Sequence, residues 1–194
     1  DWQSIIKFFI MFPLYTVASF TSEIIEILRD SDGLREIGIR GDCVYAIYTT
    51  PLQSDTYECV DKATYINTYL KMLNNLLALK KYPTIAVGIG VGTAEELIVK
   101  AGRKDVGINN PVWIGDAVTG ASNLSAIANK DGHPPIAFSD LTYANTIEKI
   151  KEINSEKDVD RWFTKYSDDK LGTYYCANIV KELFNDWIDG GMKE

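Results

Sequence analysis

The chain has 194 residues, of which 46% are hydrophobic and 24% are charged. This length and composition fit one folded domain with its own core and exclude an intrinsically disordered chain. The net charge of −7 argues against binding of duplex DNA, which requires a surface rich in lysine and arginine. A nucleoside triphosphate remains compatible with this charge, because divalent cations neutralise its phosphates locally.

The first segment is the most apolar part of the chain. The run Phe8–Phe20 is 13 residues long, too short to span a bilayer, and Pro13 interrupts it. Apolar residues continue at helical spacing to Asp30, so the pattern predicts one long buried helix and no membrane span. The 3 scattered cysteines contain no C-x-x-C pair and favour reduced thiols in a cytoplasmic protein.

The rest of the chain alternates between hairpins and helices. In order, it predicts a hairpin over 33–51, a helix over 55–82, a buried strand over 83–102, a strand and helix over 112–128, a short strand over 134–140, a helix over 141–153, a hairpin over 163–180 and a helix over 181–191. This order indicates a single α+β domain over 1–194, with helices on one face of a sheet.

The turn of the first hairpin brings charged residues together. Gly38, Arg40 and Asp42 share one strand face, since side chains alternate along a strand. A carboxylate at a hairpin tip is suited to Mg²⁺, which accepts one or two carboxylates together with substrate phosphates. Taken alone, a simple turn aspartate is favoured by roughly three to one on turn statistics.

The stretch "VWIGDAVTGASNLSAIA" (112–128) reads as a strand that turns into a helix of small residues. Thr119 and Asn123 are four residues apart and therefore share one helical face. A hydroxyl and an amide on that face are suited to hydrogen bonding, but neither side chain carries charge.

Three segments in this order resemble the class III nucleotidyl cyclase catalytic domain: "IRGDCVYAIY", "VGIGVGTAEELIVKAG" and "VWIGDAVTGAS". The resemblance runs from Thr21 to about Val180. It implies a ferredoxin-like α+β fold, with a central, mostly antiparallel sheet and flanking helices. It further implies a head-to-tail homodimer with active sites shared between protomers, and two divalent cations (Mg²⁺ or Mn²⁺) per site. The reaction implied is attack of a ribose 3′-oxygen on the α-phosphate of the same nucleotide, which expels pyrophosphate.

The resemblance also assigns roles to individual positions. Asp42 matches one of two metal-binding aspartates, and the second is expected on a strand before the first helix. Because the pattern from Asp1 onward predicts no such strand, we expect it upstream of this sequence. Thr119 matches the asparagine that orients the ribose, and Asn123 matches the arginine that stabilises the transition state.

The two purine-recognising positions also differ from the family pattern. Gly38 stands where purine cyclases have a lysine, and Val112 stands where they have an acidic or polar residue. This combination resembles the pyrimidine cyclases of the bacterial anti-phage Pycsar system, which make cyclic UMP or cyclic CMP. Two roles for Trp113 are equally favoured: it narrows the pocket so that only a base with one ring fits, or it belongs to the core. Arg40 offers a planar donor to a pyrimidine carbonyl or a phosphate, which favours UTP as the substrate.

Several alternatives stay open at this point. One alternative is CTP or a purine nucleotide as the substrate, and another is a catalytically degenerate cyclase fold that serves as a dimerising or ligand-sensing module. Lys165 and Lys170 lie in the terminal hairpin, where the family often has a triphosphate-binding lysine. Exposed, solvated lysines are favoured there by roughly two to one.

Overall fold

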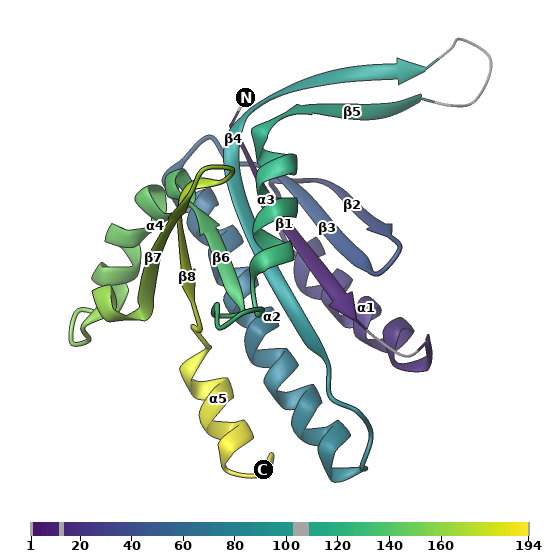
Figure 1. The fold of residues 1–194 in the computed structure, drawn as a ribbon, viewed down its shortest axis with the longest axis vertical. Coiled ribbons are helices and arrows are strands. Elements are labelled where there is room, and N and C mark those ends of the chain that lie inside the picture. Colours follow the sequence, from purple (N-terminus) through teal and green to yellow (C-terminus); the bar gives the residue numbers. More distant parts are fainter. Residues whose placement is uncertain (1, 12–13, 103–108, 194) are drawn as a thin grey trace.

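The computed structural model describes residues 2–11, 14–102 and 109–193 (Figure 1). Its elements in chain order are β1 (Trp2–Met11), α1 (Leu14–Arg29), β2 (Leu34–Arg40), β3 (Cys43–Thr49), α2 (Gln53–Leu79), β4 (Ala86–Gly102), β5 (Asn109–Gly115), α3 (Asp116–Ile127), β6 (Ile136–Ser139), α4 (Asp140–Ile153), a 3-10 turn (Val159–Trp162), β7 (Phe163–Asp168), β8 (Gly172–Ala177) and α5 (Glu182–Asp189). Both predicted hairpins are therefore confirmed, and so are the predicted helices that correspond to α2, α3, α4 and α5.

The strands form one mixed sheet in the order β2-β3-β1-β4-β6-β8-β7, with β5 paired to the outer half of β4. Among the described strands, the pairing of β4 with β6 is parallel and the other pairings are antiparallel. The predicted α+β class and mostly antiparallel sheet are confirmed.

The amino-terminal segment differs from the prediction. The long helix predicted from Phe8 is confirmed only over α1, Leu14–Arg29, because β1 extends to Met11 and lies between β3 and β4 at the centre of the sheet. Ile5 faces one layer and Ile6 the other, and they are only 1% and 0% exposed. A strand buried on both faces reads as a continuous apolar run, which periodicity alone cannot distinguish from a buried helix. Pro13 lies outside the described residues.

The sheet carries helices on both faces, which corrects the one-faced arrangement predicted above. Helices α1, α2 and α4 pack with the main core on one face, and α3 packs alone on the other (Figure 1). Gly88, Gly90 and Gly92 point from β4 toward α3. A Cβ built on Gly90 would lie 2.1 Å from the Ala121 carbonyl oxygen of α3. The alternating glycines thus allow the helix backbone to lie directly on the strand.

The outer half of β4 and β5 form a two-stranded arm that projects from the body of the molecule (Figure 1). The described apolar side chains of this arm are largely exposed, with Leu97 at 62% and Ile114 at 52%. Such a surface is unusual on a monomer and is typical of a protein interface.

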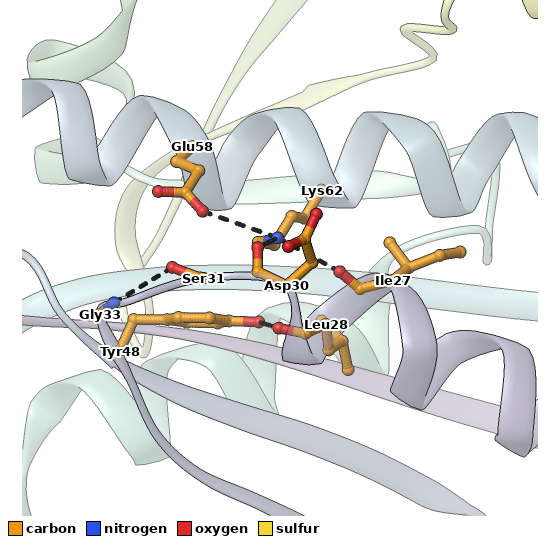
Figure 2. Close-up of polar contacts among 8 residues, drawn as sticks. All are labelled: Ile27, Leu28, Asp30, Ser31, Gly33, Tyr48, Glu58 and Lys62. Atoms are coloured by element: carbon orange, nitrogen blue, oxygen red, sulfur yellow. Dashed lines mark hydrogen bonds and ion pairs between the residues drawn. The ribbon is translucent and has the colours of Figure 1, made fainter.

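The carboxyl end of α1 is fixed by polar contacts to α2 and β3 (Figure 2). The buried Lys62 ammonium donates to the carbonyl oxygens of Ile27, at 3.2 Å, and Asp30. Tyr48 donates its hydroxyl to the Leu28 carbonyl at 2.7 Å. These donors satisfy helix-end carbonyls and place a positive charge at the negative end of the helix dipole. They fix the point from which the chain turns into β2.

Within the described part of the chain, no helix combines the length and apolarity that crossing a membrane requires.

Candidate active site

The β2–β3 turn presents Asp42 to solvent. Gly41 adopts a φ of +62°, a left-handed conformation that a glycine accepts without strain. Arg40 and Asp42 flank it, and both side chains are exposed. The Cys43 thiol donates to Asp42 at an Sγ–Oδ1 distance of 3.6 Å. Burial and the neighbouring Asp42 charge raise the pKa of the Cys43 thiol, so it stays protonated beside the carboxylate.

Gly38 lies under the ring of Tyr45, its partner across the hairpin. A Cβ at position 38 would lie 2.3 Å from both Cζ and the hydroxyl oxygen of Tyr45. Any side chain at position 38 would therefore have to displace the tyrosine ring. The position predicted to lack a purine-recognising lysine is filled by an aromatic ring from the next strand.

Glu36 links this tyrosine to β5. Its Oε1 accepts a hydrogen bond from the Tyr45 hydroxyl at 2.6 Å, and its Oε2 accepts one from Trp113 Nε1 at 2.7 Å. Trp113 also packs against Ile5 and Ala121, so it is partly core and partly a wall of this cluster. The core reading of Trp113 is thus confirmed in part, whereas its narrowing of a base pocket stays a prediction. Through Tyr45 and Glu36, the structure links the predicted positions Gly38 and Trp113. Val112 lies beside Trp113 and is exposed.

Helix α3 carries the other two predicted residues. Thr119 is exposed and Asn123 is half-buried. The start of the helix is held by Glu96 of β4, which is 5% exposed and whose Oε1 accepts from the Ala117 backbone N–H at 2.6 Å. A carboxylate at this point is favourable, because it complements the positive end of the helix dipole. Sequence reasoning missed Glu96, which fixes where α3 begins.

Lys7 is a second residue that sequence reasoning missed. It lies on β1 opposite Tyr45 on one side and Gly90 on the other, and its Nζ donates to Ser122 Oγ of α3 at 2.8 Å. It therefore places a cation beneath the helix that carries the uncharged Asn123. The reading of the amino-terminal run as a helix concealed it, since strand alternation would have placed Lys7 on the same face as Ile5.

The predicted residues fall into two groups within one protomer. Among the described contacts, no hydrogen bond or ion pair joins Asp42 or Arg40 to Thr119 or Asn123. A cavity of about 670 Å³ lies between α2, α4 and α5, and none of the predicted site residues lines it. The candidate site is thus an open surface between the hairpin and α3.

The structure also describes the positions expected for the second metal carboxylate and for the terminal-hairpin lysines. The strand β1 occupies the position beside β3, and Trp2–Met11 contains no aspartate or glutamate. Lys165 is exposed, with its Nζ 5.9 Å from the centre of the Tyr175 ring. Lys170 is exposed in the turn. The strand that we expected upstream of this sequence is therefore present as β1, which corrects that prediction, and it carries no carboxylate. A triphosphate contact for these lysines stays a prediction.

Comparison with solved structures identifies the fold. The chain superposes on the adenylyl cyclase CyaB from P. aeruginosa with a TM-score of 0.66 at 14% identity, covering 91% of this chain and 93% of that one. A bacterial light-regulated adenylyl cyclase gives a TM-score of 0.64 at 19% identity and 97% coverage of both chains. The guanylate cyclase domain of RhGC from Catenaria anguillulae, solved in complex with GTP, gives 0.61 at 16% identity and covers 93% of this chain and 98% of its own. The fold is that of the class III nucleotidyl cyclase catalytic domain.

Two curated relatives bear a more specific name. A uridylate cyclase from Treponema porcinum is 53% identical over 176 residues, 91% of this chain, and this chain spans 59% of its length. A uridylate cyclase from Gulbenkiania mobilis is 26% identical over 178 residues, which cover 88% of this chain and 69% of the relative. No family model matches the chain. The chain thus combines the class III nucleotidyl cyclase fold with sequence similarity to uridylate cyclases, and the resemblance to the pyrimidine cyclases is confirmed.

Proposed function

We propose that this chain is the catalytic domain of a pyrimidine nucleotide cyclase, which converts UTP into 3′,5′-cyclic UMP and pyrophosphate. The observation that carries the proposal is the 53% identity to a uridylate cyclase across 91% of the chain. We further propose that the enzyme acts in the cytoplasm in anti-phage defence, as its resemblance to the Pycsar cyclases implies. The fold supports a cyclase. Glu36, Gly38, Tyr45, Val112 and Trp113 form a surface that we call the base-binding wall, and this wall supports a narrowed pocket.

The shape of the base-binding wall supports a base with a single ring. Tyr45 covers Gly38, so the side-chain position that would contact a purine is filled. The indole N–H of Trp113 is already donated to Glu36, so Trp113 would contact a base with its ring rather than through that hydrogen bond. Val112 adds an apolar surface. A site with this wall favours the smaller pyrimidine ring, and Arg40 of the same hairpin is an exposed donor for a uracil carbonyl or a phosphate.

The proposed chemistry is an intramolecular displacement. The ribose 3′-hydroxyl loses its proton and its oxygen forms a bond to the α-phosphorus, while the bond from the α-phosphorus to the bridging oxygen breaks and pyrophosphate leaves. Thr119 and Asn123 would hold ribose and α-phosphate oxygens by hydrogen bonds, and positioning of this kind supplies a large share of such catalysis. Lys7 and Arg40 would supply positive charge near α3 and the hairpin.

Asp42 fits a divalent cation, Mg²⁺ or Mn²⁺, that is held jointly with the triphosphate. Such a cation takes one or two carboxylates, and substrate phosphates and water complete its coordination. Among the described residues, no group of three or more histidine, cysteine, aspartate or glutamate side chains is arranged to hold a metal without substrate. When bound, divalent cations stabilise charge on the attacking and leaving oxygens. Two cations per site, as in the family, require a second carboxylate beyond Asp42.

The active unit that we propose is a homodimer with shared sites. Within one protomer, the Asp42 hairpin and the Thr119–Asn123 face are not joined by a described contact, which fits a site completed by a second copy. The exposed apolar arm of β4 and β5 offers a surface for that contact. Each site would combine Asp42 of one protomer with α3 and the Gly38–Trp113 wall of its partner.

A second candidate is a cyclase fold without catalysis, acting as a dimerising or ligand-sensing module. The uncharged Thr119 and Asn123, and the absence of a carboxylate from Trp2–Met11, favour this alternative.

One experiment separates the two candidates. The protein is incubated with each of the four ribonucleoside triphosphates and Mn²⁺, and product mass and released pyrophosphate are measured. Cyclic UMP from UTP supports the proposal. Binding of a nucleotide without turnover of any of the four would support the module, and a purine product alone would overturn the choice of substrate.

A further inference from the structure

Glu36 has no role in the chemistry described above, yet its carboxylate is the centre of the base-binding wall. It lies half-buried on β2, two residues before Gly38 and on the same strand face. Its two oxygens accept the Tyr45 hydroxyl at 2.6 Å and Trp113 Nε1 at 2.7 Å. Both distances are short, as expected for hydrogen bonds to an ionised acceptor.

This geometry couples two aromatic side chains from different parts of the chain. Tyr45 comes from the neighbouring strand β3, whereas Trp113 is 77 positions away from Glu36 on β5. One planar carboxylate that accepts from both rings fixes their separation and orientation together. Because Tyr45 lies on Gly38, Glu36 also determines whether the space above Gly38 stays filled.

We propose that Glu36 is a positioning residue for substrate selection: it holds Tyr45 over Gly38 and Trp113 beside it, and thereby closes the base pocket to purines. This inference rests on the proposed cyclase function. Glu36 acts through the two rings and makes no contact with the reacting atoms.

The protonation state of Tyr45 agrees with this arrangement. The hydrogen bond to Glu36, burial and the Glu36 charge raise the pKa of Tyr45, while the nearby Arg40 lowers it. The phenol thus stays protonated and able to donate throughout the neutral range, where Glu36 accepts its hydrogen bond. Other charged groups near Tyr45 include Lys7, its partner across β1 and β3.

Two substitutions at position 36 separate geometry from charge. In Glu36→Gln, the amide oxygen can accept from Trp113 while the amide nitrogen donates to the Tyr45 oxygen, so both links are retained. In Glu36→Leu, the bulk is retained but both acceptors are lost. Glu152→Leu is the matched control, since Glu152 is an exposed glutamate of α4 that pairs with Lys149.

The first readout does not depend on catalysis. In ¹⁵N-labelled protein, the Trp113 indole N–H resonance is identified by its absence in Trp113→Phe. It is expected to lie downfield and exchange slowly in the unchanged protein and in Glu36→Gln. It is expected to move upfield and exchange faster in Glu36→Leu. An unchanged resonance in Glu36→Leu would overturn the coupling, whether or not the protein is a cyclase.

The second readout is the ratio of kcat/KM for UTP to that for ATP. We expect this ratio to fall by roughly tenfold or more in Glu36→Leu, which is within the range that pocket shape alone provides. It should stay close to the original in Glu36→Gln and Glu152→Leu. An equal loss on both nucleotides would make Glu36 a stability residue only and overturn the proposal.

Two further experiments cover the cases in which Glu36→Leu does not fold or the unchanged protein shows no turnover. If Glu36→Leu fails to fold, Trp113→Phe removes one of the two links while keeping a ring, and the ratio should still move toward ATP; no movement would overturn the proposal. If the unchanged protein turns over no nucleotide, the proposed function fails. The same comparison is then made with equilibrium binding of UTP and ATP, and equal relative affinities in all variants would overturn the role of Glu36.

Discussion

Tyr45 and Gly38 face each other across the β2–β3 hairpin, and the space left by the glycine is occupied by the tyrosine ring. A side chain at position 38 would meet the tyrosine ring at 2.3 Å, so the glycine and the ring are compatible only together. Introducing the purine-recognising lysine of the family at position 38 would therefore disturb Tyr45 and its bond to Glu36 before it met any base. The base selectivity that we propose would therefore depend on a group of residues rather than on one position.

Asp42 is the residue on which the proposed chemistry depends most. Asp42→Ala is expected to reduce cyclisation to background, because Asp42 is the metal ligand that we propose. Unfolding stability should change by no more than about 0.5 kcal/mol, since the side chain is exposed. Turnover of UTP and a urea unfolding curve measure the two effects. A folded variant with full activity would remove Asp42 from the mechanism.

Substitutions of Arg40 and Asn123 test which residue supplies the positive charge of the family's transition-state arginine, whose position Asn123 occupies. Hydrogen bonds to ionised groups are about twice as strong as neutral ones, so Arg40→Ala should reduce kcat more than Asn123→Ala. Loss of one preorganised donor typically costs ~10²–10³ in turnover. Kinetics of both variants on UTP and CTP measure this. If Arg40→Ala changes the preference between the two nucleotides more than the rate, Arg40 contacts the base; wild-type kinetics on both would leave it a surface residue.

At the scale of elements, the contact of α3 with β4 positions the helix that carries Thr119 and Asn123. Glycine alternation on β4 lets the α3 backbone approach the strand, and Glu96 fixes the start of the helix. The orientation of Thr119 and Asn123 therefore depends on a packing contact several residues away from either side chain.

Gly90→Ala tests this contact. The added Cβ would lie 2.1 Å from the Ala121 oxygen and 2.5 Å from the Ser125 nitrogen, both backbone atoms that cannot rotate away. Overpacking of this kind destabilises a protein by about 1–3 kcal/mol, and displacement of α3 should lower activity as well. Gly120→Ala is the control within α3, since a Cβ there meets nothing within 4 Å. It should raise stability by roughly 0.5–1 kcal/mol. Equal unfolding midpoints for the two variants would contradict the packing account.

Sequence patterns predicted the elements whose signals are local. The hairpin around Gly41, the strand-to-helix turn before Asp116 and the amphipathic α5 are each specified by neighbouring residues, and each was confirmed. The strand β1 was missed because burial on both faces removes the alternation that identifies a strand. The placement of α3 opposite the other helices had a signal in the alternating glycines of β4, which the helix-on-one-face prediction did not use.

The site was predictable only in part for a related reason. Asp42, Thr119 and Asn123 follow from short motifs. Glu36 and Lys7 become visible only when distant strands are paired, since Trp113 meets Glu36 from 77 positions away. No local pattern encodes such a contact, because it arises from the register and order of the sheet.

At the scale of the whole molecule, the shared site that we propose would make activity a property of the dimer. Mixing Asp42→Ala protein with Asn123→Ala protein should restore one intact site per heterodimer, because each variant damages a different half of the site. The mixture should regain a clear fraction of wild-type turnover after subunit exchange, followed with differently tagged chains. Two inactive variants that exchange subunits and stay inactive would contradict shared sites and favour a site built within one protomer.

The central claim is that the chain cyclises a pyrimidine nucleotide, and competition tests it most directly. The protein is given an equimolar mixture of UTP, CTP, GTP and ATP with a divalent cation, and the cyclic products are resolved by mass, with Asp42→Ala as the blank. The account predicts that cyclic UMP dominates, that cyclic AMP and cyclic GMP are minor, and that all products disappear in the blank. Cyclic purine nucleotides as the main products, or no Asp42-dependent product from any of the four, would contradict it.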